Sequence, residues 1–203
     1  MSCCRSVPVT DRQTIDAYTT HVAEYLSVPL PREQIEARMA FAEAVVPEGF
    51  VLDLGSGPGA DSTFFQRQGL RVRALDATPA FVNHARENGV DAHLGTFDDV
   101  TEDGVYDGIY ASFSLLHAPR ADFSRHLAAI QRAMKPGGIF FLGLKLGTGE
   151  HRDELDRYYT YFSQTEIEEA LAQAGFTIDQ ITTGMGTGLA GSYDGFILVL
   201  AHA

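Results

Sequence analysis

Apolar side chains recur at spacings of three and four residues in the early part of the chain, which is typical of a helix with one buried face. This pattern predicts a helix over residues 11–26, with Asp11 placed to cap its first turn. Two prolines then interrupt the pattern, and a second helix is predicted over residues 32–46. Residues 1–10 carry no such pattern and are predicted to form a loose leader.

From residue 50 onward, short apolar runs alternate with amphipathic stretches. The predicted strands cover residues 50–52, 72–75, 90–94, 106–111 and 139–144, and the predicted helices between them cover residues 60–68, 79–88 and 120–134. Strands that alternate with helices indicate a parallel sheet with helices on both faces.

The last part of the chain has a different pattern. A helix is predicted over residues 164–174, ending at Gly175, and two strands are predicted over residues 176–182 and 196–201. The glycine-rich segment 184–191 between these strands need not carry a crossover helix, so the strands can pair antiparallel. The sequence therefore predicts an α/β fold: a Rossmann-like, doubly wound, seven-stranded sheet, mostly parallel, with an antiparallel C-terminal strand pair and helices on both faces.

Composition narrows the class of protein. A chain of 203 residues is long enough for one well-buried core, so a single domain over residues 1–203 is expected. With 15 basic and 27 acidic residues, the net charge of −12 disfavours a nucleic-acid partner. No apolar run approaches the roughly 20 residues that cross a bilayer. Because Cys3 and Cys4 are adjacent, they suit neither a disulfide bond that stabilises the fold nor a zinc site, and no other segment has metal-ligand spacing. Reduced cysteines are typical of a cytoplasmic protein, so a cytoplasmic location is expected.

A glycine loop follows the first predicted strand and opens a helix. It reads Asp53-x-Gly55-x-Gly57-x-Gly59, and Asp76 ends the next predicted strand. Glycines permit a close backbone approach to a ligand, and a carboxylate at the end of the next strand can accept both hydrogen bonds of a ribose diol. Two interpretations remain open at this point. Gly55-x-Gly57-x-x-Ala60 meets the loosened nicotinamide-binding pattern, whereas Asp53, two places before the first glycine, fits a methyltransferase pattern.

Four further segments follow the loop in order. They are Ala74-Leu75-Asp76-Ala77-Thr78, Gly95-Thr96-Phe97-Asp98-Asp99, Tyr106 to Ala111 with Leu115-Leu116-His117, and Leu127 to Gly138. Together with the loop, they make the chain resemble a class I S-adenosylmethionine-dependent methyltransferase from its first helix to its last strand. Five motifs in order are far more specific than any one of them.

The resemblance implies an S-adenosylmethionine site, with S-adenosylhomocysteine as product, and a set of residues for it. Asp76 is expected to bind the ribose, Gly55 and Gly57 to admit the methionine end, and residues 11–46 to cover the site. Phe97 and Asp98 are expected to hold the adenine. The full expected cofactor set is Tyr18, Asp53, Gly55, Ser56, Gly57, Asp76, Ala77, Thr96, Phe97, Asp98, Ser112 and Phe113.

One residue departs from the family pattern. Many members carry a large polar or basic residue where this chain has Ala60. Contact with the methionine end is therefore expected from elsewhere, with Tyr18 and Arg38 on the leading helices as candidates.

A narrower likeness rests on three segments, residues 114–117, 145–150 and 157–162. These are similar to small bacterial methyltransferases that are often labelled as similar to tellurite-resistance methyltransferases. That label says little about the substrate.

His117 is the candidate general base, because a histidine after the fourth strand should lie near the reactive methyl and has an ordinary pKa near 6.5. The alternative is a histidine that only hydrogen-bonds a loop. Arg157, Tyr158 and Tyr161 are candidates for the substrate pocket. Tyr158 and Phe162, four residues apart, equally fit a short helix with a buried face, and Phe162 is expected in the core. Lys145 is predicted to be a surface lysine.

The sequence thus predicts a methyltransferase for a small-molecule acceptor, by O-, N- or S-methylation or by methylation of a metalloid oxyanion. A general base is needed only if the acceptor must lose a proton. Two alternatives remain: an NAD(P)-dependent oxidoreductase, and a cofactor-binding module without catalysis. The pattern leaves the oligomeric state open.

Overall fold

The computed structural model describes residues 11–203, so the predicted loose leader with Cys3 and Cys4 lies outside the described residues. Its main feature is a seven-stranded sheet with the strand order β3-β2-β1-β4-β5-β9-β8. The strands are β1 (Phe50–Leu54), β2 (Arg71–Asp76), β3 (Asp91–Leu94), β4 (Tyr106–Ser112), β5 (Met134–Lys145), β8 (Thr177–Thr187) and β9 (Tyr193–His202). A separate hairpin is formed by β6 (Glu150–Arg152) and β7 (Tyr158–Thr160).

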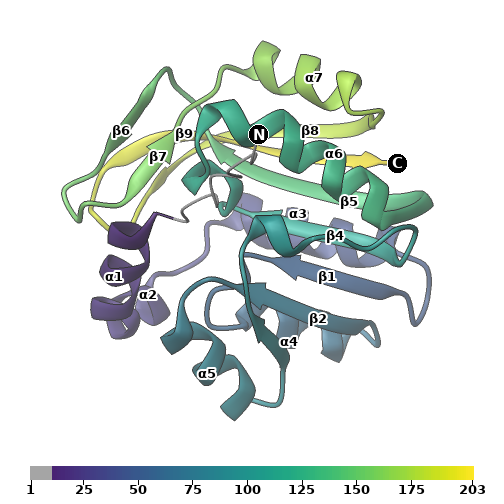
Figure 1. Ribbon diagram of the computed structural model, residues 1–203, viewed down its shortest axis with the longest axis horizontal. Helices are drawn as coiled ribbons and strands as arrows, with labels where there is room; N and C mark the ends of the chain where they lie inside the picture. Colours follow the sequence, from purple (N-terminus) through teal and green to yellow (C-terminus); the bar gives the residue numbers. More distant parts are fainter. Residues whose placement is uncertain (1–10) are drawn as a thin grey trace, which may run out of the picture.

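Figure 1 shows helices on both sides of this sheet, with α6 and α7 on one side and α3 and α4 on the other. The helices are α1 (Arg12–Thr20), α2 (Val22–Ser27), α3 (Arg32–Ala44), α4 (Ala60–Arg67), α5 (Pro79–Glu87), α6 (Phe123–Ala133) and α7 (Gln164–Gln173). Short 3-10 turns cover Phe97–Asp99, Leu115–His117 and Arg120–Asp122.

The strand order confirms the predicted fold. β1 pairs in parallel with β2 on one side and with β4 on the other, and β3 and β5 extend the sheet in parallel. β9 pairs antiparallel with both β5 and β8, because no helix separates β8 from β9. The chain therefore leaves β1 in one direction and returns to β4 on the other side. In open α/β sheets such a switch point, at the carboxyl ends of the strands, is where ligands bind.

Two apolar layers hold the helices to the sheet. Neighbouring residues of β1 point to opposite faces, so Leu52 joins the layer under α6 and α7 while Val51 joins the layer under α3 and α4. Phe41 of α3 and Phe65 of α4 are fully buried in the second layer. Burying such a side chain contributes about 1.5–3 kcal/mol to the free energy of folding, and the two layers keep the carboxyl ends of the strands in fixed positions.

The structure differs from two predictions of local structure. The predicted helix over residues 11–26 is broken at His21, whose backbone leaves the helical region, so that it forms α1 and α2. Asp11 does cap α1 as predicted, by accepting a hydrogen bond from the Thr14 amide at 3.0 Å. The short helix predicted around residues 157–162 is wrong: this segment contains β7, because it pairs with β6, a non-local partner that helical spacing does not reveal.

The helices α1 and α2 and the β6–β7 hairpin meet at the carboxyl ends of the parallel strands, at the left of Figure 1. Arg152 of β6 donates hydrogen bonds to both carboxylate oxygens of Asp11, at 3.0 and 2.7 Å. The Tyr158 amide of β7 donates to the Thr14 hydroxyl at 2.8 Å. These contacts attach α1 to the hairpin, 141 and 144 residues further along the chain.

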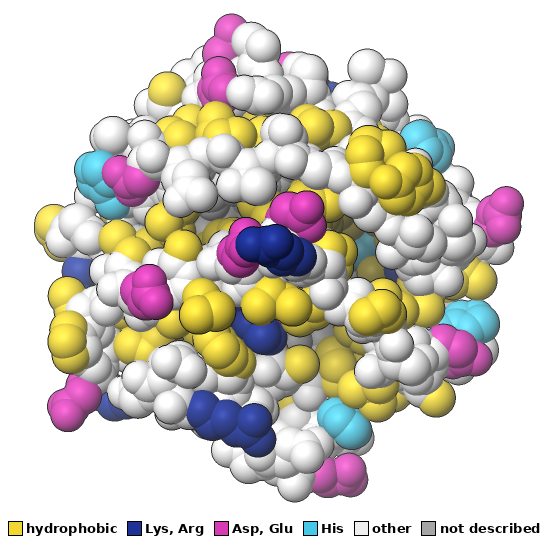
Figure 2. Space-filling view, turned by 180° about the vertical axis from the view of Figure 1, so that it is seen from behind, with side chains coloured by type: hydrophobic (Ala, Val, Ile, Leu, Met, Phe, Trp, Pro, Cys, Tyr) yellow, Lys and Arg dark blue, Asp and Glu magenta, His cyan; other side chains and the backbone are white. Residues whose placement is uncertain are grey.

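The face seen from behind, on the side of α3, carries many hydrophobic side chains between scattered charged ones (Figure 2). The exposed large hydrophobic residues of the α2–α3 region are Tyr25, Leu26, Val28, Leu30, Ile35, Met39 and Val46. Within residues 11–203, no helix has the length and apolar character to cross a membrane.

Candidate functional site

The glycine loop after β1 is held against the end of β2 by backbone hydrogen bonds. The amides of Gly55 and Ser56 both donate to the Leu75 carbonyl, at 2.7 and 3.1 Å. Gly55 and Gly57 adopt φ angles of 73° and 53°, which non-glycine residues rarely adopt. A Cβ on Gly55 would lie only 2.2 Å from the Ser114 Cβ, so the loop and the segment after β4 approach closely because the residue is glycine.

Asp76 lies at the carboxyl end of β2 and is tied to this loop. One carboxylate oxygen accepts a hydrogen bond from the Gly57 amide at 2.8 Å, and the other accepts from the Thr78 amide at 2.7 Å. The side chain is buried, and burial raises its pKa. Each carboxylate oxygen still has acceptor capacity for a ligand hydroxyl.

Asp53, by contrast, joins the start of the glycine loop to α4. It is buried and accepts a hydrogen bond from the Ser62 hydroxyl at 2.6 Å. Burial and the nearby Asp61 carboxylate raise the pKa of Asp53 to about 8. Asp61 in turn pairs with Arg38 of α3 at 2.9 Å, which joins α3 to the first turn of α4, and Arg38 lines neither of the two cavities described below.

A first cavity of about 690 Å³ opens over Asp76 and the glycine loop. The polar residues that line this cavity include Asp76, Thr78, Thr96, Ser114 and His117. Its aromatic lining consists of Tyr18, Tyr25, Phe81 and Phe97. The small residues in its lining include Gly55, Gly57 and Ala77.

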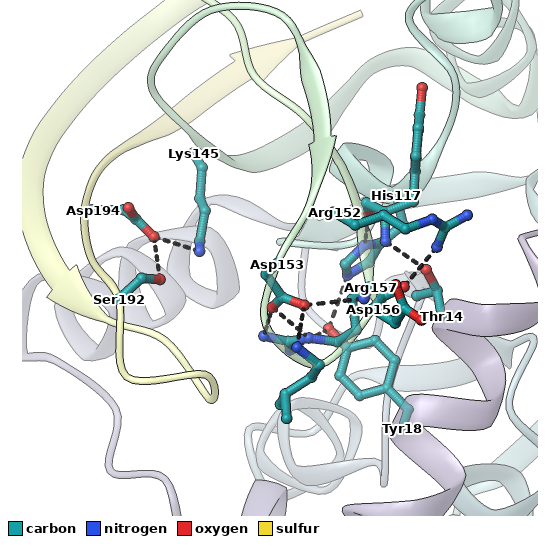
Figure 3. A network of polar contacts seen from close by, with 12 residues as sticks. Thr14, Tyr18, His117, Lys145, Arg152, Asp153, Asp156, Arg157, Ser192 and Asp194 are labelled. Atoms are coloured by element: carbon teal, nitrogen blue, oxygen red, sulfur yellow. Dashed lines mark hydrogen bonds and ion pairs between the residues drawn. The ribbon is translucent and has the colours of Figure 1, made fainter.

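Tyr18, His117 and Arg157 form a partly buried polar network where α1 meets β7 (Figure 3). The Nδ1 atom of His117 lies 2.6 Å from the Tyr158 carbonyl, which can only accept a hydrogen bond, so Nδ1 carries the proton. The Nε2 atom therefore accepts from the Tyr18 hydroxyl, at 2.8 Å. Arg157 donates to the same hydroxyl at 3.1 Å and pairs with Asp153. The network holds His117 neutral with both of its nitrogens engaged.

Burial lowers the pKa of His117 to about 4, although the hydrogen bond to the Tyr158 carbonyl opposes this shift. A group with so low a pKa is a weak base at neutral pH. The geometry therefore favours a positioning role, in which His117 fixes the Tyr18 hydroxyl. The role of general base stays a prediction.

The low pKa of His117 has a consequence for stability. Because the folded protein binds this proton less readily than the unfolded chain, whose histidines titrate near 6.5, His117 makes folding less favourable as the pH falls from about 6.5 to 4. Replacing His117 with glutamine is expected to reduce this loss. Urea unfolding at pH 7.5 and 5.0 should show a smaller drop in unfolding free energy for the variant than for the wild type. An equal drop in the two proteins would contradict the assigned protonation state. Burial also lowers the pKa of His126, but this residue is present in both proteins, so its effect on the unfolding free energy cancels in the comparison.

A second cavity of about 1,210 Å³ lies on the other side of Tyr18 and Tyr25, which line both. Its walls come from the α2–α3 connection, the glycine loop, the segment after β4 and the tip of the β8–β9 hairpin. They include Leu30, Ser56, Ala60, Asp61, Phe113, Leu116, Lys145, Arg157, Tyr159, Leu189, Asp194 and Phe196.

Lys145 corrects the prediction of a surface lysine. Its side chain is only 11% exposed, and its ammonium group pairs with Asp194 of β9 at 2.6 Å. The antiparallel pairing of β9 with β5 brings Asp194 to this place, and the sequence around Lys145 carries no sign of it.

The structure brings together most of the predicted cofactor residues, but not all. Tyr18, Gly55, Gly57, Asp76, Ala77, Thr96 and Phe97 line the first cavity, and Ser56 and Phe113 line the second. Asp53 and Ser112 line neither of them. Asp98 forms an ion pair with Arg125 and lines a third hollow together with Tyr158. The assignment of these residues to a cofactor stays a prediction.

The predicted substrate-pocket residues also separate. Arg157 lines the second cavity, and His117 lines the first and the third. Tyr161 is 8% exposed, and its ring stacks on His151 at 4.4 Å between centroids. Tyr161 thus belongs to the apolar core, as Phe162 does.

Sequence reasoning missed several residues that line the first cavity, among them Tyr25, Thr78, Phe81 and Ser114. Ser114 donates to the Leu54 carbonyl at 2.6 Å, which joins the ends of β1 and β4. Tyr25 lies seven residues after Tyr18, a spacing at which two side chains share a helix face, and this was the available signal. The two rings pack edge to face at 5.6 Å.

Known proteins resemble this chain over the segment that carries the site. Residues 51–138 match the family model described as a methyltransferase domain. A sarcosine/dimethylglycine N-methyltransferase of Halorhodospira halochloris is 32% identical over 120 residues, which are 54% of this chain and 42% of that relative. A ubiquinone biosynthesis O-methyltransferase of Xanthomonas oryzae pv. oryzae is 32% identical over 122 residues, which are 56% of this chain and 48% of that relative.

Over residues 51–138 the chain is thus similar to class I methyltransferases. It spans somewhat less than half the length of these two curated relatives. Among solved structures, the chain is similar to a Burkholderia thailandensis 1,6-didemethyltoxoflavin-N1-methyltransferase with bound 1,6-didemethyltoxoflavin and S-adenosylhomocysteine. That likeness has a TM-score of 0.68 at 21% identity and covers 100% of this chain and 92% of the other, so it bears on the fold alone.

Proposed function

We propose that this protein is an S-adenosylmethionine-dependent methyltransferase that acts on a small-molecule acceptor. The observation that carries the proposal is the hydrogen bond of 2.8 Å from the Gly57 amide of the glycine loop to the Asp76 carboxylate. Both residues line a cavity at the switch point of the sheet. The family match over residues 51–138 supports methyl transfer over nicotinamide chemistry at this loop.

The first cavity fits this cofactor in three respects. Gly55 and Gly57 form a backbone cradle that side chains would fill, since a Cβ at either position meets Ser114 or Tyr25 within 3.6 Å. Asp76 presents a buried carboxylate suited to a ribose diol, and Phe97 presents an aromatic face suited to adenine. When bound, the cofactor supplies a methyl group that its positively charged sulfur has already activated.

The chain's own residues bind and align the two partners. Asp53 holds Ser62 at the start of α4, and Asp76 holds the Gly57 and Thr78 amides, which sets the shape of the cavity floor. Tyr18, fixed by His117 and Arg157, forms part of the wall between the two cavities. Alignment alone can contribute about 7–11 kcal/mol to a displacement reaction in favourable cases.

The second cavity is the proposed acceptor site. It shares Tyr18 and Tyr25 with the first cavity and reaches the glycine loop through Ser56 and Ala60. Relatives named for N- and for O-methylation both resemble this chain, so a small-molecule acceptor is supported without a choice of the atom that receives the methyl group.

Calorimetric titration with S-adenosylhomocysteine and, separately, with NADH tests the proposal. We expect saturable binding of S-adenosylhomocysteine to the folded protein and none of NADH, because the first cavity joins Asp76 to a methyltransferase-type loop. Binding of NADH alone would favour the oxidoreductase alternative. Absence of S-adenosylhomocysteine binding at millimolar ligand would contradict the proposal. If the ligand binds but radiolabelled S-adenosylmethionine transfers no methyl to a broad acceptor panel, the module without catalysis gains support.

A further inference from the structure

Lys145 extends from the end of β5 into the wall of the second cavity, opposite the Tyr18 network (Figure 3). It is one of only two lysines in the chain. Its Nζ atom lies 2.6 Å from an Asp194 oxygen and 4.5 Å from the centroid of the Tyr159 ring. Asp194 is itself positioned by the Ser192 hydroxyl, which donates to the same oxygen at 2.7 Å. The cation is therefore held by Asp194 and the Tyr159 ring, and Ser192 holds Asp194.

The ammonium group retains capacity for a ligand. A lysine ammonium has three N–H donors, and within residues 11–203 its one hydrogen-bond partner is Asp194. A largely buried charge is costly unless it is paired, and a buried pair is often no more stabilising than well-packed apolar residues. The position of the Lys145–Asp194 pair on a cavity wall is thus better explained by the binding of a ligand than by a contribution to the stability of the fold.

The other cation of the cavity is already committed. Arg157 donates to Asp153 from its Nε atom at 2.9 Å and from a terminal nitrogen at 2.5 Å, and to Tyr18 at 3.1 Å. These contacts engage three of the five N–H groups of Arg157, including the Nε edge at which a guanidinium group binds a carboxylate. Lys145, with one of its three N–H groups engaged, is thus the less engaged of the two cations that line this cavity within residues 11–203.

Aromatic rings line the same cavity as Lys145. Phe113, Tyr159 and Phe196 line the cavity, and Phe113 has a φ angle of 51°, an uncommon conformation for a bulky residue. Its ring packs edge to face with Phe196 at 6.1 Å. Gly184 makes room for Phe196, because a Cβ there would lie 2.4 Å from the ring. These walls suit a flat apolar body.

We propose that the second cavity binds an acceptor with an aromatic body and an anionic oxygen, and that Lys145 binds this oxygen while Asp194 orients Lys145. The inference rests on the proposed function, since it takes the second cavity as the acceptor site. It adds the chemical class of the acceptor and the residue that selects it.

The test uses three probes that share a ring system and differ in charge: 2-naphthoate, 2-naphthamide and 2-naphthylmethylamine. Each is titrated into the protein saturated with S-adenosylhomocysteine, whose sulfur is uncharged and so does not itself attract an anion. We expect 2-naphthoate to bind about tenfold or more tightly than the other two, as a charge-assisted hydrogen bond from Lys145 requires. Equal affinities, or a preference for the amine, would overturn the proposal.

Matched variants separate binding from a structural role. Lys145→Met should remove the preference for 2-naphthoate, whereas Lys145→Arg should keep it. Asp194→Asn keeps a side-chain oxygen that can orient Lys145 and removes a negative charge beside the anion, so it should leave the affinity for 2-naphthoate unchanged or raise it. A merely structural ion pair would instead make Lys145→Met and Asp194→Asn equally harmful to 2-naphthoate binding, which would overturn the proposal.

Lys135→Met is the matched control, because Lys135 forms a similar pair with Asp107 at 2.8 Å and lines neither cavity. It should bind 2-naphthoate as the wild type does. All variants should keep the wild-type affinity for S-adenosylhomocysteine. If the wild-type protein did not bind S-adenosylhomocysteine, that result would count against the proposed function and not against the role of Lys145.

Discussion

Replacing Gly55 with alanine is expected to destabilise the protein by about 2–5 kcal/mol and to abolish measurable S-adenosylhomocysteine binding. The added Cβ would lie 2.2 Å from the Ser114 Cβ, so the ends of β1 and β4 must move apart. The φ angle of 73° adds the cost of a left-handed conformation for an alanine. Urea unfolding measures the first effect and calorimetric titration the second.

Gly137→Ala is the matched control for this substitution. Gly137 has a φ angle of 74°, but no atom lies within 4 Å of the position of its Cβ. It should therefore lose only the conformational part, about 1–2 kcal/mol, and bind S-adenosylhomocysteine normally. If both variants lost the same stability, the close contact between Gly55 and Ser114 would not be a real constraint.

Replacing Asp76 with alanine is expected to weaken S-adenosylhomocysteine binding by about 10- to 150-fold, because hydrogen bonds to a charged group contribute roughly 1.5–3 kcal/mol. The change also leaves the amides of Gly57 and Thr78 without their acceptor, so the loop itself should loosen. Calorimetric titration measures the affinity, and unfolding curves report the loss of stability separately.

Two further variants make this result specific. Asp76→Asn keeps a side-chain oxygen for one of the two amides and should fold better than the alanine variant, yet it should still bind the ligand more weakly than the wild type. Asp91→Ala changes an exposed aspartate at the start of β3 and should leave the affinity unchanged. An unchanged affinity in Asp76→Ala would show that the ribose assignment is wrong.

Most of the fold could be predicted from the sequence because its elements are marked by local patterns. The seven strands and the helices between them follow from apolar periodicity, and the antiparallel end of the sheet follows from the lack of a helix between β8 and β9. Local patterns failed where pairing is non-local. β7 forms because it pairs with β6, and the break at His21 separates helices whose apolar spacing runs on without interruption.

The site could be predicted only in its central part. The glycine loop and Asp76 are recognisable because each follows a strand directly, and parallel strands bring their carboxyl ends together. The surroundings were harder to predict. Tyr18 meets His117 across 99 residues and Arg157 across 139, and these partners arrive on separate elements.

The sequence by itself determined the alternation of strands and helices, the backbone freedom of the glycine loop and the place of Asp76 after its strand, since each depends on neighbours a few residues away. Only the tertiary structure decided that His117 is a neutral hydrogen-bond acceptor for Tyr18, that Tyr161 is a core residue and that Lys145 is buried beside Asp194. Burial and the partner across the cavity set the charge state and the role of such groups, and both arise from contacts between distant segments.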